Sequence, residues 1–356
     1  VLDPVETELA KLADYHIRLR PGTNVAVLNM MLYFIVKSKL YKKECIDDRT
    51  EGFDKFFEHI NSLNIDQLAK ESATYTRGYV TSPLCGPSLA SIITGKYAFQ
   101  HGQTGNDAGN SKREPPLWMT SNSSNLKKKK SNDYLFSKER NDQFDVIKAK
   151  FYKHKLLTEY LSEKGYRSFQ SGKWWLGSWR EGKFDDGMTH GDYKKRGRHG
   201  DEGLKIGREG LDPIFNFVDQ TQKDKVPFFV WYAPFLPHTP HNPPKELLDK
   251  YIEVAPNESV AKYWAMCEWL DQTVGDLMNY LKEKSLDQNT LVVYTTDNGW
   301  IQSAKHNRYA PRSKRAPHEG GVRTPIMFKL PGVIQPEINN TNFVSNIDLV
   351  PTVLSF

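Results

Sequence analysis

The sequence predicts an α/β fold in which helices cover both faces of a mostly parallel sheet. Two observations support this prediction: short, continuously apolar runs that suit strands buried on both faces, and amphipathic segments that alternate with them along the chain. The 356 residues suffice for one large domain or two modest ones with a sizeable core. An apolar content of 38 % with mixed charges is typical of a globular chain and excludes wholesale disorder.

The first buried strand is expected at 23–36, an apolar run that follows Pro21-Gly22. Later strands are expected at 75–79, 167–170, 227–232, 290–295 and 322–328. Helical spacing of apolar residues predicts helices at 53–72, from 90 onward, and at 156–164, 207–220 and 259–284. Two segments lack either pattern: 181–203 is expected to be a loop, and the Lys-rich stretch 108–147 a long, polar, solvated insertion.

Composition excludes several classes of protein. No apolar run approaches about 18 residues, so no membrane-spanning helix is expected, and three cysteines cannot form a disulfide framework. The Lys run at 127–130 has no interleaved aromatic residues, so it does not indicate a nucleic-acid partner despite the net charge of +6. The chain begins with acidic and polar residues and without Met, so we expect any signal peptide to lie outside it.

Side chains that can act as nucleophiles, acids, bases or metal ligands follow the predicted strands at the point where each strand ends. Cys85 comes after the strand at 75–79, Lys173 after 167–170, and His238 after 227–232; Asp297-Asn298 directly follow the strand at 290–295. Ligands collect at the carboxyl ends of strands in sheets of this kind. A thiol, an ammonium, an imidazole and hard oxygen ligands together indicate a metal-assisted site for an anionic substrate.

These residues lie in blocks that resemble a known family. Residues 85–97, CGPSLASIITGKY, resemble the sulfatase signature, which is C-x-P-S-R followed by an apolar stretch and T-G-[RK]-Y. Five further blocks agree in type and order, at 64–69, 172–177, 237–240, 296–299 and 313–325, and 346–352 resembles the segment that closes the sulfatase large domain. The resemblance covers 21–356. It implies an alkaline-phosphatase-like α/β fold, a catalytic domain over 21–356, and a smaller C-terminal subdomain that is absent or truncated.

The resemblance implies a formylglycine-dependent sulfatase. In this family the signature cysteine is oxidised to formylglycine (3-oxoalanine) by a formylglycine-generating enzyme, and by position that residue is Cys85. A divalent metal, usually Ca²⁺, holds the hydrated aldehyde and a sulfate oxygen. The matching metal ligands are the modified Cys85, Asp297 and Asn298, together with an Asp-Asp pair.

Further roles follow from the same resemblance. Lys173 and Lys314 match lysines that neutralise charge on the sulfate and the leaving oxygen, and His238 matches the histidine beside the leaving group. Trp175 and His241 are expected to contact substrate. Taken without the resemblance, each lysine could be a solvated surface charge, and His238 and His241 could be rigid loop residues between prolines.

Three positions depart from the family pattern. The Asp-Asp pair normally follows the first strand, where this chain has Met30-Met31, so we assign its role to Asp47 and Asp48; an exposed acidic turn is the alternative. The signature arginine is replaced by Leu89, and a frequent histidine of the G-K-W block is replaced by Trp175. Leu89 bears on maturation and on rate, because the cysteine-oxidising enzyme and the mature site both use the arginine.

The leading interpretation is a sulfuric ester hydrolase, acting on a sulfated small molecule or polysaccharide outside the cytoplasm, whether periplasmic, secreted or lysosomal. Two alternatives stay open: a catalytically silent relative that binds sulfated glycans, and a phosphoesterase of the same superfamily. The pocket loops at 108–147 and 178–206 carry no pattern that names the substrate.

Overall fold

The computed structural model describes residues 63–106, 138–192 and 199–356. The chain divides into two compact units, Val1–Gln67 and Leu68–Phe356, and the second contains the sheets and the helices from α6 onward. The predicted strand at 23–36, the Asp47-Asp48 pair and most of the polar insertion lie outside the described residues.

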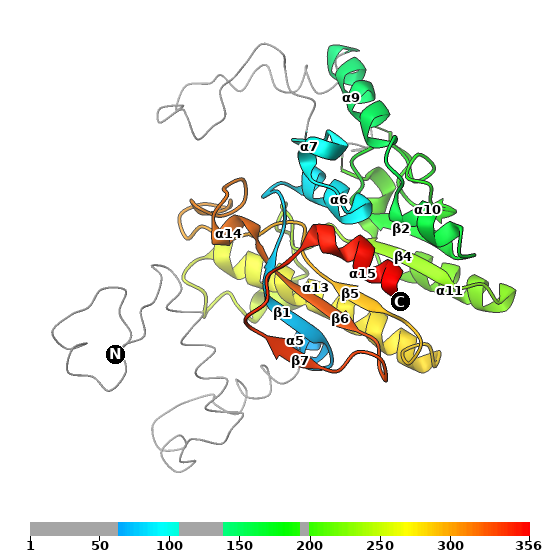
Figure 1. Ribbon diagram of the computed structural model, residues 1–356. Coiled ribbons are helices and arrows are strands. Elements are labelled where there is room, and N and C mark those ends of the chain that lie inside the picture. The colour runs from blue at the N-terminus through cyan, green and yellow to red at the C-terminus, as the bar shows by residue number, and fades with distance from the viewer. Residues whose placement is uncertain (1–62, 107–137, 193–198) are drawn as a thin grey trace. The chain divides into compact units, whose positions relative to one another are not determined.

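Two sheets form the centre of the second unit (Figure 1). The first has the order β5 (Val292–Tyr294), β6 (Arg323–Lys329), β1 (Ala73–Tyr79) and β7 (Glu337–Asn339), with β8 (Val344–Ser345) also paired to β1. The second has the order β3 (Asp186–Gly187), β2 (Arg167–Gly172) and β4 (Phe228–Ala233). Strand β6 runs antiparallel to β1 and β5, whereas all other pairs are parallel. The predicted α/β class is therefore confirmed.

Strand β4 shows why the predicted strands are continuously apolar. Phe229 and Trp231 pack into one core with helices on one side, and Phe228, Val230 and Tyr232 pack into another on the opposite side. Successive side chains of a strand point to opposite faces, so a sheet that is covered on both faces needs apolar residues at every position.

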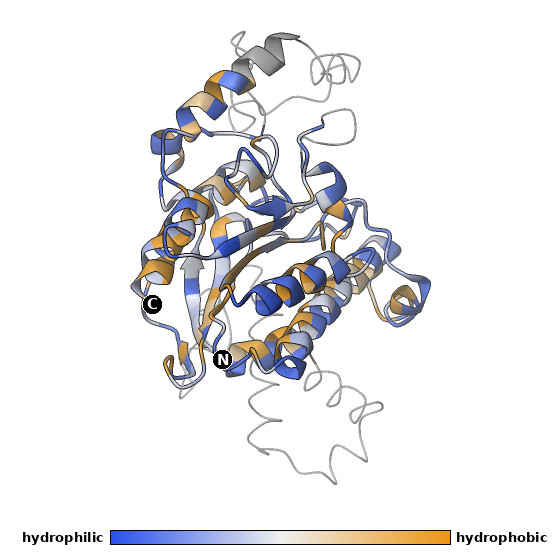
Figure 2. Ribbon diagram, turned by 90° about the vertical axis from the view of Figure 1, so that its right-hand side faces the viewer, coloured by the Kyte–Doolittle hydropathy of each residue, from blue (hydrophilic) through white to orange (hydrophobic). Residues whose placement is uncertain are grey.

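The described residues form the helices α5 (Asn64–Lys70), α6 (Cys85–Thr94), α7 (Ala98–His101), α9 (Lys138–Phe151), α10 (Leu157–Ser162), α11 (Asp212–Asp224), α12 (Lys245–Asp249), α13 (Glu258–Glu283), α14 (Glu319–Val322) and α15 (Leu349–Ser355). Figure 1 shows α15 in front of the first sheet and α13 behind it. Along the helices in Figure 2, apolar residues alternate with hydrophilic ones, as expected for helices that pack by one side. No helix in the described ranges is long and apolar enough to cross a membrane.

The structure corrects two boundaries. Residues 138–147, predicted to belong to the solvated insertion, form the start of α9. The buried Phe144 and Phe151, with Ile147 between them, belong to the same core, because positions separated by three, four and seven residues share a helix face. The helix predicted at 207–220 starts at Asp212 instead, where Pro213 occupies the first turn, a position that tolerates the missing N–H.

Candidate active site

The topology brings the predicted site residues to one edge of the sheets. Cys85, Lys173 and His238 follow the carboxyl ends of β1, β2 and β4, and Asp297-Asn298 follow β5. Strand β6 is antiparallel, so its amino end lies at the same edge, and the loop before it carries Lys314. In Figure 1 this is the edge next to α6 and α14.

Cys85 is the first residue of α6 and its side chain is buried. The Lys314 ammonium donates to Cys85 Sγ at 3.0 Å, and Sγ donates to Asn298 Oδ1 at 3.2 Å. Burial raises the pKa of the Cys85 thiol, and the carboxylate of Asp297 raises it further, against the opposing effect of the nearby lysines. The buried thiol is therefore held in its neutral form, and it contacts one ammonium group and one amide oxygen.

Lys173 and Asp297 form a buried ion pair beside Cys85. Their Nζ and Oδ2 atoms are 2.8 Å apart, and their side chains are 9 % and 14 % exposed. Burial alone would lower the pKa of Lys173, but the Asp297 carboxylate outweighs it and raises that pKa. Burial would likewise raise the pKa of Asp297, but Lys173 and Lys314 hold it below its usual value. Both groups stay charged, so the site holds two ammonium groups and one carboxylate.

The imidazole of His238 is close enough to Lys173 and Lys314 for their charges to act on it. Its Nδ1 is 2.7 Å from the Thr239 carbonyl oxygen, so Nδ1 carries the proton and Nε2 presents its lone pair. Burial lowers the pKa of His238, and the charges of Lys173 and Lys314 lower it further. An arriving anion would offset those charges and make protonation of Nε2 easier.

Asp297 and Asn298 offer a carboxylate and an amide oxygen, the hard donors that calcium prefers. Calcium takes about 6–8 oxygen ligands. Across 63–106, 138–192 and 199–356, no three His, Cys, Asp or Glu side chains come close enough together to hold a metal ion. Asp297 and Asn298 could therefore supply two ligands of a cation, which is fewer than calcium needs. Asp47 and Asp48 lie outside the described residues, so their assignment stays a prediction.

Leu89 and Trp175 line a cavity of about 10 Å³ beside Gly86, and both are buried in the apolar core. Gln103 also lines it, and neither atom of its amide has a hydrogen-bond partner in the described part of the chain. His241 packs against the rings of Tyr263 and Trp300 at 5.4 and 5.8 Å. That Trp175 and His241 contact substrate stays a prediction.

Several supporting residues were not predicted from the sequence. Asn106 Oδ1 accepts the N–H of Gly86 at 2.8 Å, which satisfies a first-turn donor of α6 that Leu84 cannot cap. A Cβ on residue 86 would lie 2.5 Å from Gln103 Nε2, so a larger residue here would displace the Gln103 amide. Neither contact has a local signal, because Asn106 and Gln103 reach α6 from beyond the following helix.

His101 is a second residue that the sequence did not single out. It is fully buried, its Nε2 lies 3.2 Å from Ser91 Oγ of α6, and its Nδ1 accepts the N–H of Gln103 at 3.1 Å. Burial lowers its pKa to about 4, helped by the charge of His154.

This depressed pKa predicts acid lability. The unfolded chain binds a proton at His101 below about pH 6.5, whereas the folded chain resists it down to about pH 4. Stability is therefore present above pH 6.5 and falls as the pH drops to 4, by roughly 3 kcal/mol for this group. Urea unfolding at pH 7, 5.5 and 4.5 should show a smaller loss for His101→Gln than for the wild type. An equal loss of unfolding free energy with falling pH in His101→Gln and in the wild type would contradict the assignment of this acid lability to His101.

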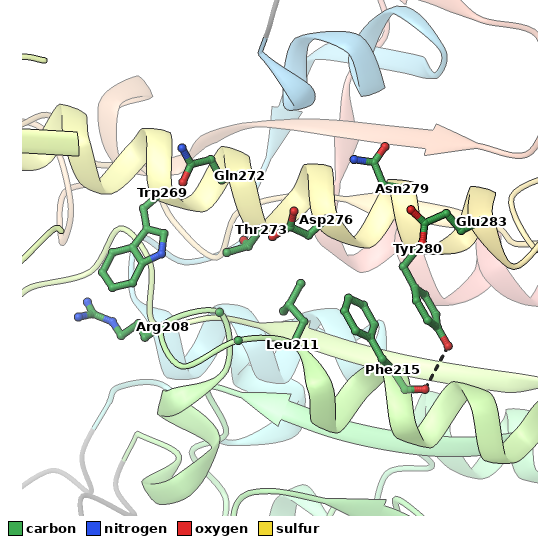
Figure 3. A pocket seen from close by; sticks show the side chains of 12 residues that line it. Arg208, Leu211, Phe215, Trp269, Gln272, Thr273, Asp276, Asn279, Tyr280 and Glu283 are labelled. Carbon is green, nitrogen blue, oxygen red and sulfur yellow. Dashed lines mark hydrogen bonds between the residues drawn. The ribbon is translucent and has the colours of Figure 1, made fainter. Parts of the chain in front are cut away.

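Arg208 organises the loop that carries His238. Its guanidinium donates to the carbonyl oxygens of Phe235 at 2.9 Å and His238 at 3.2 Å, and to Asn242 Oδ1 at 2.7 Å. Figure 3 shows Arg208 opposite Trp269 at one end of a cavity of about 560 Å³, which runs between α13 and the start of α11. None of the residues assigned above to the candidate site lines this cavity.

Removing this clamp is expected to misplace His238. Arg208→Ala should lower the kcat/KM of a reaction at this site by about tenfold to a hundredfold, because displacements near 1 Å have effects of this size. The matched control is Arg180→Ala, which removes an exposed arginine that stacks on Trp179. Equal kinetics for Arg208→Ala and the wild type would show that the clamp is dispensable.

Comparison with known proteins agrees with this geometry. A Sulfatase family model matches residues 57–356. The chain belongs to the sulfatase family. It is similar to a protein named "Sulfatase" from Formosa agariphila, with 36 % identity over 155 residues, which are 40 % of this chain and 28 % of that protein. It is also similar to an ulvan-active sulfatase of the same organism, with 22 % identity over 331 residues, 83 % of this chain and 57 % of that protein.

Solved structures show the same fold. The crystal structure of Ps i-CgsB in complex with k-i-k-neocarrahexaose matches with a TM-score of 0.60 and 25 % identity, over 82 % of this chain and 65 % of that chain. The chain thus spans less than two thirds of the length of each of these sulfatase-family relatives and of this solved structure.

Proposed function

We propose that the chain hydrolyses sulfate esters, with Cys85 as the precursor of a formylglycine nucleophile. The observation that carries this proposal is the surroundings of Cys85 Sγ: Lys314 at 3.0 Å, Asn298 at 3.2 Å, and the Lys173–Asp297 pair beside them. Four separate sequence segments supply the groups that a tetrahedral anion needs, and packing alone gives no reason for two buried lysines.

Each residue has a defined part in this proposal. A hydrated formylglycine would supply the attacking hydroxyl, and a cation held by Asp297 and Asn298 would polarise the sulfate. Lys173 and Lys314 bind the sulfate oxygens and stabilise the negative charge that develops during transfer. His238 holds a proton on Nδ1, so Nε2 would first take up a proton from solvent once the anion is bound and would then deliver that proton to the leaving alcohol oxygen.

We further propose a sulfated polysaccharide as substrate. The ulvan-active relative and the structure that contains a carrageenan oligosaccharide support this choice, and the absence of a readable pattern in the pocket loops leaves the sugar unspecified. Activity outside the cytoplasm, after maturation by a formylglycine-generating enzyme, is part of the same proposal.

The test uses full-length chain produced with a formylglycine-generating enzyme. Sulfate release is measured on an aryl sulfate and on sulfated oligosaccharides, and alcohol release is measured on a phosphate diester. Faster turnover of the sulfates supports the proposal. Faster turnover of the diester would favour a phosphoesterase. Glycan binding without any turnover would favour a silent binding protein, an alternative suggested by Leu89, Trp175 and Met30-Met31.

A further inference from the structure

The loop between β5 and α14 is strongly basic. Residues 300–318, called here the basic loop, contain no Asp or Glu. They contain five Lys or Arg residues and two histidines, namely Lys305, His306, Arg308, Arg312, Lys314, Arg315 and His318. Lys314 is buried against Cys85, whereas the other six are exposed. The basic loop therefore carries one buried lysine that lies inside the candidate site and several basic side chains that are exposed outside it.

The backbone of the basic loop is held in place. Gln302 and Tyr309 form an antiparallel bridge, and Ser303 N–H donates to the Arg308 carbonyl at 2.9 Å. Asn257, which caps α13, also donates from Nδ2 to the Ala304 carbonyl at 2.6 Å. The exposed cations at 305 and 308 are thus carried on a fixed hairpin.

Backbone conformation next to Lys314 is also unusual. Arg312 and Arg315 have φ values of 58° and 71°, in the left-handed region that residues with a side chain rarely adopt. Such strain persists where the surrounding structure demands it, and it is common at functional sites. The two arginines flank the lysine that reaches Cys85, so the same turn directs Lys314 inward and exposes the arginines.

The exposed cations of the basic loop have no acidic partner in the described part of the chain. Among the residues that the structure describes, Lys305, Arg308, Arg312 and Arg315 make no ion pair with a carboxylate. The first acid after the loop, Glu319, is engaged by Arg323 at 3.3 Å and accepts from Tyr79 at 3.0 Å. Like charges gathered without counter-charges repel one another, and a bound polyanion would relieve that repulsion.

Aromatic rings connect the site to the basic loop. The Trp300 ring lies 5.6 Å from Lys314 Nζ and packs against Tyr263 at 6.2 Å and Tyr309 at 5.2 Å. Trp300 is only partly exposed and its N–H is already bonded to Gln302, so it forms a wall and is not a free stacking platform. This arrangement suits a sugar chain that passes along an apolar wall better than the splayed bases of a nucleic acid.

We propose that the basic loop binds additional sulfate groups of a polysulfated glycan, on sugar residues beyond the ester that is cleaved. This inference rests on the proposed function and narrows the substrate to chains with several sulfates. Lys305 and Arg308 at the tip are the groups that distinguish a polysulfated chain from a monosulfated one.

The test measures binding in a Cys85→Ala background, which removes turnover. Calorimetry at physiological salt compares a hexasaccharide that carries a sulfate on every sugar with one that carries a single sulfate. K305Q/R308Q should weaken binding of the polysulfated sugar by about tenfold and change the monosulfated sugar far less. The charge-conserving pair K305R/R308K should retain binding within about twofold.

The matched control is K223Q/K282Q, which removes two exposed charges elsewhere. Asn257, which contacts the basic loop, caps the N-terminal end of α13, and Lys282 lies in the last turn of that 26-residue helix. At about 1.5 Å per residue, Lys282 is therefore roughly 37 Å from Asn257. The proposal would be overturned if K305Q/R308Q bound the polysulfated sugar as tightly as the wild type, or if K223Q/K282Q lost as much affinity for that sugar as K305Q/R308Q. Tighter, loop-dependent binding of an oligonucleotide with the same number of charges would make the loop a nucleic-acid site instead.

These outcomes are separable from the proposed function. Loop-dependent glycan binding by a matured chain that releases no sulfate would leave this inference standing and reject the hydrolase. Sulfate release with no difference between K305Q/R308Q and K223Q/K282Q would keep the hydrolase and reject the role of the loop.

Discussion

Replacement of Cys85 by alanine is expected to lower sulfate release by at least about a thousandfold, because the nucleophile of the proposed reaction is made from this side chain. The fold should tolerate the change, since alanine is smaller than cysteine and, within the described part of the chain, the thiol makes only two hydrogen bonds, to Lys314 and Asn298. Initial rates on an aryl sulfate, together with thermal unfolding of the same preparation, measure both effects.

Cys267 supplies the matched control. It lies in the middle of α13, where burial raises its pKa to about 11, and its thiol bonds with Tyr263 and is not part of the site. Cys267→Ser should keep the activity of the matured wild type within about twofold. Activity of Cys85→Ala within tenfold of the wild type would contradict the proposed nucleophile.

Replacement of Asp297 by asparagine is expected to affect both stability and rate. The buried Lys173 ammonium would lose its only carboxylate partner in the described part of the chain, which lies at 2.8 Å. Breaking a buried pair by removing one partner costs about 3–5 kcal/mol. The charge balance at the sulfate and one of the five predicted cation ligands would change as well, so kcat/KM should fall by at least about a hundredfold.

The control for stability is Asp224→Asn. It breaks the Arg167–Asp224 pair, which has a similar distance of 2.7 Å but side chains that are 37 % and 35 % exposed. Exposed pairs contribute about 0–1 kcal/mol, so this variant should unfold close to the wild type. K173M/D297N should regain much of the lost stability without regaining activity. Full activity in Asp297→Asn would argue against the site.

The core strands and helices could be predicted because their patterns are local. The continuous apolar run at 227–232 locates β4, the largely apolar segment 322–328 locates β6, and helical spacing at 259–284 locates α13. The direction of β6 could not be predicted, because a strand buried on both faces has the same apolar pattern in either orientation. The start of α9 was missed because the polar residues before Phe144 outweigh the few apolar ones on its packed face.

The candidate site was predicted through ordered motifs, and the structure brings its described members together. Lys173 and Asp297 are 124 positions apart, yet both follow strands that end at the same edge. The supporting contacts could not be predicted, because Asn106, Gln103 and Arg208 act through geometry across loops and no sequence spacing encodes it. Leu89, which replaces the signature arginine, lines the same small cavity as the Gln103 amide, which has no hydrogen-bond partner among the residues that the structure describes.

The central claim is that Cys85 becomes the formylglycine of a working sulfatase site. Mass spectrometry of the peptide that contains Cys85, from chain produced with a formylglycine-generating enzyme, tests this directly when sulfate release is measured on the same sample. We predict that sulfate release rises in proportion to the fraction of Cys85 in which the thiol has been replaced by an aldehyde. Turnover by chain with an unmodified thiol, or complete conversion without turnover, would contradict the claim.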